Sequence, residues 1–274
     1  MAVKKKANTL AKSGGKALAK TNQSDSMLSL MEQDSQQASG FENIGAEDLA
    51  IPYISILQAL SPQLRGEAKI KGAEEGDFYN TVTQEIFKED ITVIPCAYKK
   101  LWVEWVPRNH GGGLAGIHET DSILEQCKKD ENKRDVLPNG NNIVATAYHY
   151  CLLVKENNDI ERVVLPFTST QLKKSRRWNT QMLNQKAMIK GRKVTPPMYS
   201  HMYTIETEEE SKDQNTWCGW LISNPQIIKD PELYMAARQF NNDITKGAVK
   251  VAPPQDDAPV NSNSSYEPED DEHF

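Results

Sequence analysis

Residues 168–193 carry a dense set of cationic side chains without an acidic neighbour. These cations are Lys173, Lys174, Arg176, Arg177, Lys186, Lys190, Arg192 and Lys193. Acidic residues are absent from a longer window, residues 163–205. Ammonium and guanidinium groups without local counter-ions attract polyanions, of which the phosphates of nucleic acid are the simplest candidate. The stretch predicts a phosphate-binding surface, unless carboxylates from elsewhere in the fold neutralise it.

Aromatic residues near these and other cations indicate which kind of nucleic acid would bind. Single strands are held by a cationic groove together with aromatic rings on which bases stack. The candidate stacking residues are Trp178, one of Trp102 and Trp105, and one of Tyr199 and Tyr203. Further phosphate contacts are expected from Lys99, Lys100 and Arg108. Alternation along a strand puts Trp105 on the face of Val103 and Trp102 on the opposite face, so we expect one indole to be exposed and the other buried.

Other chemistries have weaker support in the sequence. The glycines of residues 111–116 fit the spacing of a dinucleotide-binding loop, but Pro107 precedes them and no strand–helix–strand pattern surrounds them. Residues 118–121 contain a histidine and two acids that a metal-dependent nuclease could use, yet one short run does not make a metal site. We therefore expect a binding protein and not an enzyme, with no metal and no cofactor.

The charge of the chain, −6 overall, is divided among three zones. Residues 1–42 are rich in lysine and then in Gln and Ser, which predicts a disordered basic arm. From residue 254 onward there are seven acids and neither Lys nor Arg, so we predict that residues 249–274 form a disordered acidic tail. The middle segment, residues 43–248, is long enough to bury a hydrophobic core.

Composition excludes several classes of protein. No apolar run approaches the length of a membrane helix, and no apolar stretch follows the first lysines as it would in a secretion signal. The four cysteines lack the close pairing of a zinc site, so we expect free thiols in a reducing compartment. These features predict a cytoplasmic protein without membrane contact.

Runs of β-branched and aromatic residues predict six or seven strands in the middle segment. The expected strands are residues 78–87, 90–98, 99–107, 142–154, 160–167, 198–206 and 215–223. A turn at 157–159 would join two of them as a hairpin. One helix is expected from about Thr170 to Lys190, and Asp230 would cap a second helix at 230–244. The pattern predicts a mainly β fold with inserted and C-terminal helices, built as an antiparallel barrel or sandwich.

The ending YEPEDDEHF combines acids with a terminal aromatic residue. Such a segment can occupy the cationic surface when nucleic acid is absent, or it can dock on another protein, with the acids steering and Phe274 filling a pocket. A purely solubilising tail is the third interpretation. The residues expected to contact partner proteins are Glu269, Asp270, Asp271, Glu272 and Phe274.

This ending resembles the C-termini of bacterial and tailed-phage single-stranded DNA-binding proteins. The segments AIPYISILQALSPQ, VIPCAYKKLWVEWVPRNHGGGL and STQLKKSRRWN also resemble a group of phage proteins described as single-stranded DNA-binding. The likeness covers most of residues 41–225. It implies an OB-like barrel over residues 43–248, cooperative coating of unwound DNA, and recruitment of replication or recombination enzymes through the tail, in the host cytoplasm if the chain is phage-encoded. The chain departs from the compact bacterial form in its greater length, its DEHF ending and its long basic helix.

Together these features predict a protein that coats single-stranded DNA without strong sequence preference during phage DNA replication or recombination. The alternative is a phage structural or scaffold-type interaction protein, and a metal-dependent nuclease has less support. The sequence leaves open whether the protein forms a homo-oligomer and whether it prefers DNA or RNA.

Overall fold

The computed structural model describes residues 27–34, 40, 43, 51–212 and 214–247. The chain divides into two units, Met1–Asp48 and Leu49–Phe274. In the first unit, residues 27–34 form a helix with exposed side chains, within the part of the sequence predicted as a disordered arm. Most of that arm, and the predicted tail at 249–274, lie outside the described residues.

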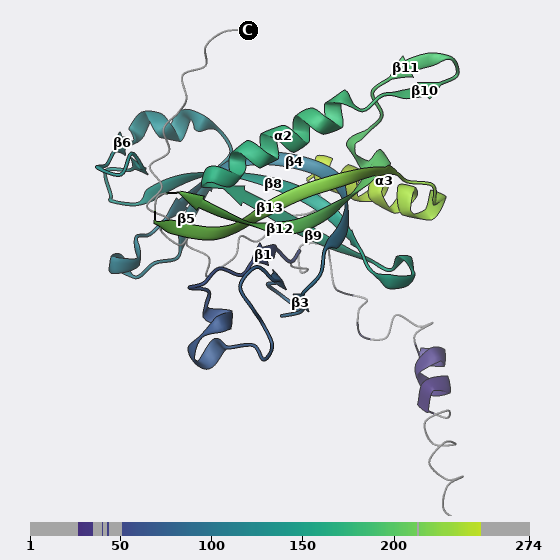
Figure 1. Cartoon of the computed structure of the whole chain (residues 1–274), viewed down its shortest axis with the longest axis horizontal. Helices are drawn as coiled ribbons and strands as arrows, with labels where there is room; N and C mark the ends of the chain where they lie inside the picture. The colour runs from purple at the N-terminus through teal and green to yellow at the C-terminus, as the bar shows by residue number, and fades with distance from the viewer. Residues whose placement is uncertain (1–26, 35–39, 41–42, 44–50, 213, 248–274) are drawn as a thin grey trace, which may run out of the picture. The chain divides into compact units, whose positions relative to one another are not determined.

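A curled antiparallel half-barrel forms the body of the second unit (Figure 1). Within the described residues its eight strands are β4 (Ile91–Trp105), β5 (Leu114–His118), β6 (Lys128–Lys129), β7 (Asp135–Val136), β8 (Asn142–Val154), β9 (Ile160–Thr168), β12 (His201–Lys212) and β13 (Asn215–Ile227). The strand order is β13-β12-β4-β8-β7-β6, with β5 paired to β4 and β9 paired to β8. The predicted fold class, mainly antiparallel β with added helices, is confirmed.

The remaining elements are short, apart from two helices. A separate sheet consists of β1 (Ile54–Ile56), β2 (Phe78–Asn80) and β3 (Ile86–Phe87), and a separate hairpin consists of β10 (Ala187–Ile189) and β11 (Arg192–Val194). The α-helices of this unit are α2 (Leu172–Asn184) and α3 (Pro231–Thr245). The 3-10 turns are η2 (Pro62–Leu64), η3 (Gly66–Ala68), η4 (Arg108–His110), η5 (Asp121–Gln126), η6 (Glu156–Asn158), η7 (Ser169–Gln171) and η8 (Met198–Ser200). None of the described helices is long and apolar enough to cross a membrane.

Strand pairing explains where the observed strands differ from the expected ones. The predicted strands 90–98 and 99–107 are one strand, β4, because its pairing with β8 continues unbroken from Tyr98 to Lys99. The predicted hairpin of β8 and β9 is confirmed. The expected strand 198–206 continues as β12 to Lys212, because β13 pairs with the whole acidic stretch.

The helix predicted through the cationic stretch ends earlier than expected. Gln185 has non-helical backbone angles, φ −60° and ψ 135°, so α2 stops at Asn184 and not at Lys190. Lys190 and Gly191 both have positive φ, 49° and 75°, which is the backbone of a two-residue type I′ hairpin turn. The cationic stretch is therefore a helix followed by a β-hairpin. The second predicted helix is confirmed as α3, where the side chain of Asp230 accepts a hydrogen bond from the backbone N–H of Glu232.

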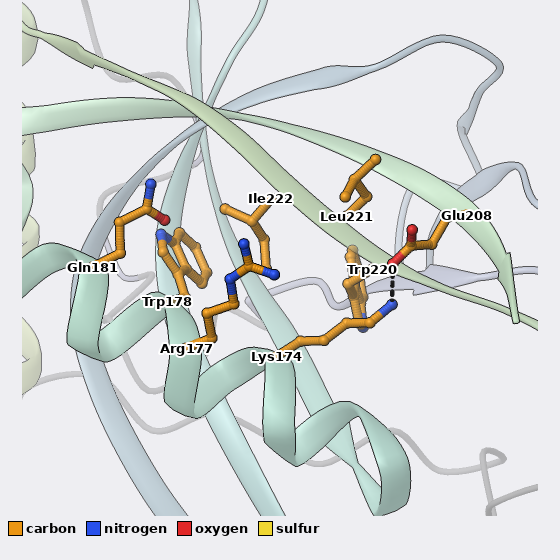
Figure 2. A pocket seen from close by; sticks show the side chains of 8 residues that line it. All are labelled: Lys174, Arg177, Trp178, Gln181, Glu208, Trp220, Leu221 and Ile222. Atoms are coloured by element: carbon orange, nitrogen blue, oxygen red, sulfur yellow. Dashed lines mark hydrogen bonds and ion pairs between the residues drawn. The ribbon is translucent and has the colours of Figure 1, made fainter.

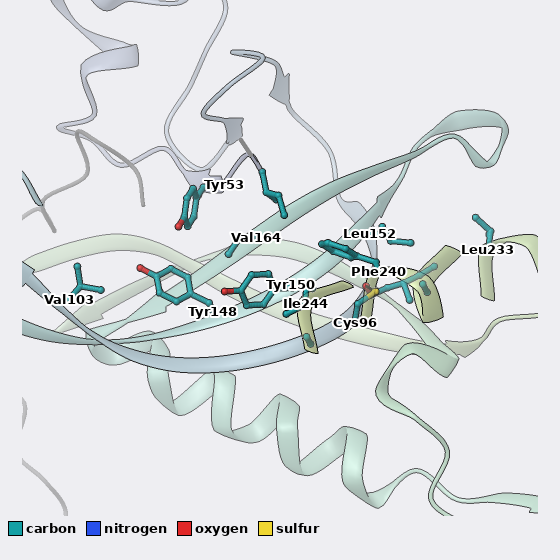
Figure 3. Close-up of a cluster of buried hydrophobic side chains, with 14 of the residues drawn as sticks. Tyr53, Cys96, Val103, Tyr148, Tyr150, Leu152, Val164, Leu233, Phe240 and Ile244 are labelled. Carbon is teal, nitrogen blue, oxygen red and sulfur yellow. Dashed lines mark hydrogen bonds between the residues drawn. The ribbon is translucent and has the colours of Figure 1, made fainter. Parts of the chain in front are cut away.

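Two hydrophobic cores lie on opposite faces of the sheet. On one face, Leu233 and Phe240 of α3 join a cluster that includes Leu152 (Figure 3). On the other face, Trp178 of α2 joins a cluster that includes Leu153. Neighbours such as Leu152 and Leu153 belong to different cores because successive side chains of a strand point to opposite faces. The sheet therefore presents separate surfaces to α2 and to α3.

Two glutamine side chains pair with the outer edge of β13. The amide of Gln58 accepts a hydrogen bond from the Cys218 N–H at 2.9 Å and donates one to the Cys218 carbonyl at 2.8 Å. Gln171 accepts a hydrogen bond from the Trp220 N–H at 3.0 Å. These amides occupy backbone groups that an edge strand would otherwise leave to solvent. They link β13 to the segments that follow β1 and β9.

This arrangement makes Gln58 important for stability. Replacing Gln58 by Leu keeps the size of the side chain but leaves both Cys218 backbone groups without that partner. We expect the free energy of unfolding to fall by about 1–3 kcal/mol in urea denaturation. Gln226→Leu, at an exposed position of the same strand, is the matched control. Equal stability of the two variants would show that the Gln58 amide does not hold β13.

Candidate nucleic-acid interface

One side of α2 is buried against the sheet and the other is cationic. Ser175, Trp178 and Met182 are buried, with the spacing of a single helical face. Arg176 and Arg177 are exposed, as is Lys173. Because the apolar residues fix the rotation of the helix, Lys173 and Arg176 lie on the side opposite the sheet, whereas Arg177 lies at the flank that faces β13.

Lys174 does not belong to the exposed set. Its ammonium group lies 2.7 Å from the Glu208 carboxylate, marked in Figure 2, and also contacts Glu210. Glu210 accepts further hydrogen bonds from Gln171 at 3.0 Å and from the Trp217 indole at 3.1 Å. Strand β12 therefore supplies counter-ions for Lys174, which the sequence analysis did not anticipate, and a phosphate contact of Lys174 stays a prediction.

Arg177 lies beside a small pocket between α2 and β13 (Figure 2). The pocket is lined by Lys174, Arg177, Trp178, Gln181, Glu208, Trp220, Leu221 and Ile222. Its volume is about 90 Å³, which accommodates several water molecules but does not enclose a nucleotide. A nucleic acid at this position would lie across the surface.

Two of the predicted stacking residues are inside the core. Trp178 and Tyr203 are each 1% exposed, and their rings contact one another at a centroid distance of 5.5 Å. Trp178 also stacks on His149, with centroids 4.5 Å apart. The predicted base stacking on Trp178 and Tyr203 is wrong, because no base can reach rings that the packing of α2 covers.

The two indoles of β4 follow the predicted alternation. Trp105 is 7% exposed and belongs to the core under α3, so it is not available for stacking. Trp102 is partly exposed on the opposite face, and the ammonium of Lys100 lies 5.2 Å from the centroid of its ring, a cation–π contact. Lys100 and Trp102 share the sheet face that α2 covers. Lys99 points to the other face, so the structure does not bring it together with them.

Tyr98 extends this exposed row, and the sequence analysis did not select it. Tyr98 is 37% exposed, and the centroid of its ring lies 5.1 Å from that of His149. Burial raises the pKa of the Tyr98 hydroxyl, while hydrogen bonding to Ser175 and the charge of Arg176 act in the opposite direction. We call Tyr98, Lys100 and Trp102 the β4 row. Their two-residue spacing in the sequence could have revealed that Tyr98 lies on the same face as Lys100 and Trp102, because alternate residues of a strand share a face.

The remaining predicted cations lie mainly on the hairpin that follows α2. Lys190, Arg192 and Lys193 are exposed on β10–β11 and its turn. Lys186 donates hydrogen bonds to the Leu183 carbonyl at 3.1 Å and to the Thr195 hydroxyl at 2.5 Å. These contacts fix the base of the hairpin to the end of α2. We call the outer side of α2 together with this hairpin the α2 surface.

Other predicted residues lie away from this surface. Tyr199 packs edge-on against Tyr234 of α3 at a centroid distance of 5.5 Å and contacts the core on the α3 side, so it does not join the β4 row. Arg108 is exposed in turn η4, after the end of β4. The predicted partner-binding residues, 269–274, lie outside the described residues.

The histidine of the run at 118–121 is engaged with Glu104. His118 Nε2 lies 3.0 Å from Glu104 Oε2, and the Asn141 amide donates a hydrogen bond to Glu104 Oε1 at 2.6 Å. The hydrogen bond from Asn141 is the main cause that lowers the pKa of Glu104. Among the described residues, no group of three or more His, Cys, Asp or Glu side chains is placed to hold a metal ion.

Comparison with known proteins identifies the family of the chain. A family model described as Pam3 phage gp34-like protein matches residues 19–250. The chain belongs to this phage protein family. The match to the gp34-like family includes α2, the β10–β11 hairpin and the β4 row, whereas residues 251–274 lie beyond it. The predicted phage origin is thereby confirmed.

No curated protein and no solved structure matches this gp34-like chain. The OB type of barrel, which the resemblance implied, therefore stays a prediction.

His149 lies beneath α2, where it supports the buried side of the helix. It is fully buried, and its Nε2 lies 2.8 Å from the Ser175 hydroxyl. Burial lowers the pKa of His149 from 6.5 to about 3. In the unfolded chain the His149 ring takes up a proton near pH 6.5, whereas the buried ring stays neutral to a much lower pH. Above pH 6.5 the ring is neutral in both states, so the fold keeps its full stability there. That stability is lost as the pH falls toward 3.

This linkage predicts acid-sensitive stability. Between pH 7 and pH 5, His149 should lower the free energy of unfolding by about 2 kcal/mol. His149→Gln keeps a polar partner for Ser175 but cannot titrate, so its stability should change less over this interval in urea denaturation. His110→Gln, at an exposed position, is the control and should behave as the wild type does. An unchanged pH dependence in His149→Gln would contradict the assignment.

Proposed function

We propose that this protein binds single-stranded DNA, without strong sequence preference, during phage DNA replication or recombination. The observation that supports it most is the combination of the α2 surface with the β4 row on the same side of the sheet. The cations come from a 43-residue window, 163–205, that contains no acid. A cationic surface next to exposed rings is the general form of a single-strand site.

The contacts divide between phosphates and bases. Lys173, Arg176 and Arg177 on α2 bind the backbone of the strand, joined by the exposed cations of the hairpin. Trp102 and Tyr98 offer ring faces to bases. Every base has a flat face that can stack, so such contacts tolerate any sequence. The ion pair of Lys174 with Glu208 removes one cation from this set and leaves the others at exposed positions.

The acidic ending has a separate role in the proposal. We propose that it recruits replication or recombination proteins, with Phe274 filling a pocket of the partner and the neighbouring acids steering the encounter. The acids concerned are Glu269, Asp270, Asp271 and Glu272. This role depends on the resemblance of the ending to single-stranded DNA-binding proteins.

Charge reversal tests the phosphate contacts. If about five phosphates are neutralised, log affinity for oligo-dT should fall with log salt at a slope of about −3.5. Arg176→Glu with Arg177→Glu should lower the affinity at least about tenfold and reduce the slope by about 1.4. Fluorescence anisotropy of a labelled oligo-dT measures both quantities.

The matched control for this test reverses one cation of α3 and one directly after its C-terminal end, Arg238→Glu with Lys246→Glu. Both are exposed, and α3 packs on the opposite face of the sheet from α2. This variant has the same net charge as the α2 variant, so it separates a local contact from a change in overall charge. Equal losses of affinity in the two variants would remove α2 from the interface.

Substitution of Trp102 tests the stacking. Trp102→Ala should weaken oligo-dT binding by about 1–3 kcal/mol, the usual contribution of one stacked base, whereas Trp102→Phe should keep most of the affinity. The same anisotropy titration measures both variants. If Trp102→Ala binds as the wild type does, the bases do not stack on the β4 row.

One titration separates this proposal from the alternatives. Oligo-dT is added to the wild-type chain with and without Mg²⁺, and both tryptophan fluorescence and the length of the oligonucleotide are followed. Quenching with an intact oligonucleotide supports single-strand binding. Absence of binding favours a structural or scaffold-type interaction protein, and Mg²⁺-dependent shortening favours a nuclease.

A further inference from the structure

The β10–β11 hairpin stands apart from the rest of the second unit. It forms its own two-stranded sheet and extends beyond the C-terminal end of α2 (Figure 1). The turn is tight, with two residues of positive φ, and Lys186 anchors the base through Leu183 and Thr195. A two-stranded hairpin without a packed face is marginally stable alone, so this one depends on its anchored base and on its tight turn.

Both faces of the hairpin expose an apolar side chain beside a cation. Met188 is 70% exposed and pairs across the hairpin with Lys193. Ile189 is 52% exposed and pairs with Arg192. Directly paired residues share a face, so one side of the ribbon exposes Met188 beside Lys193. The other side exposes Ile189 beside Arg192 and also carries the partly buried Ala187 and Val194. Neither Met188 nor Ile189 is buried against the rest of the protein, as the apolar face of an amphipathic hairpin would be.

A partner for these faces must offer flat apolar surface next to negative charge. Nucleic acid has this chemistry, since its bases are apolar on their faces and its phosphates are anionic. The end of a duplex leaves the face of its last base pair uncovered, and apolar side chains are known to enter between base steps and unstack them. A two-stranded ribbon is also narrow enough to enter a groove of the duplex.

We infer that the β10–β11 hairpin is a wedge that acts where single-stranded DNA meets duplex. Met188 and Ile189 contact base faces at the junction, while Lys190, Arg192 and Lys193 contact the flanking phosphates. The inference rests on the proposed binding of single strands along α2, because that contact would place the hairpin at the end of the bound strand. The hairpin then opens the terminal base pairs, a property distinct from holding the strand.

A forked DNA with 2-aminopurine at the last base pair of its duplex tests the wedge. The wild-type chain should raise the 2-aminopurine fluorescence as this base unstacks. Met188→Thr with Ile189→Thr keeps strand-forming residues and all the cations of the hairpin. This variant should lower the fluorescence increase by roughly threefold or more, while its affinity for oligo-dT stays within about twofold of wild type.

Leu183→Ser is the matched control, because Leu183 is also apolar and 67% exposed but lies on α2 and not on the hairpin. It should open the fork as the wild type does. Circular dichroism of each variant verifies that the fold is kept. A loss of fork opening in Leu183→Ser equal to that of the hairpin variant would overturn the wedge, since any exposed apolar residue would then have the same effect.

The outcomes distinguish this inference from the proposed function. If the wild type binds oligo-dT but the hairpin variant opens the fork equally well, the wedge is overturned and single-strand binding stands. If the wild type binds neither DNA, both fail. Binding to vesicles of anionic phospholipid that is lost in the hairpin variant, without fork opening by the wild type, would assign the hairpin to a membrane surface and overturn the wedge.

Discussion

The packing of Trp178 against the sheet is the interaction on which the candidate interface depends. The indole is in contact with His149, Phe167 and Tyr203, and it fixes both the position and the rotation of α2. A helix with a different rotation would turn Lys173 and Arg176 toward the strands and leave the indole in solvent. The cost of exposing so large an apolar side chain holds the cations outward. The residue that first suggested base stacking therefore acts as the support of the cationic surface.

The curl of the sheet decides which charges remain available. It brings Glu208 and Glu210 of β12 to Lys174, although more than thirty residues separate them in the sequence. A lysine that is already paired with carboxylates binds a phosphate less favourably, because the existing ion pair must first be broken. The β10–β11 hairpin, which carries Lys190, Arg192 and Lys193, extends past the end of α2 (Figure 1). The positive surface is thus displaced from the beginning of α2 toward its outer side and the hairpin.

The alternation of side chains along β4 decides which of its aromatic residues are buried and which are exposed. In β4, Trp105 enters the core under α3, whereas Trp102 and Tyr98 lie on the face of α2. Tyr199 is held on the α3 side by Tyr234. Two rings on the α2 face of the described residues, Tyr98 and Trp102, therefore follow one strand. This linear arrangement suits an extended chain better than a compact ligand.

Local patterns in the sequence determined a large part of the fold. The β8–β9 hairpin, α3 with its Asp230 cap, and the opposite directions of Trp102 and Trp105 follow from alternation, turn residues and capping, which act over a few neighbouring residues. The sequence also determined that residues 163–205 contain no acid. The end of α2 before the Lys190–Gly191 turn is a local feature that the sequence analysis missed. Only the tertiary structure decided that Lys174 is neutralised, that Trp178 and Tyr203 are buried, and that Tyr98 is exposed. These features depend on contacts between residues far apart in the chain, such as Lys174 with Glu210 and Trp178 with His149, and the spacing of residues along a sequence has no information on which distant segments meet.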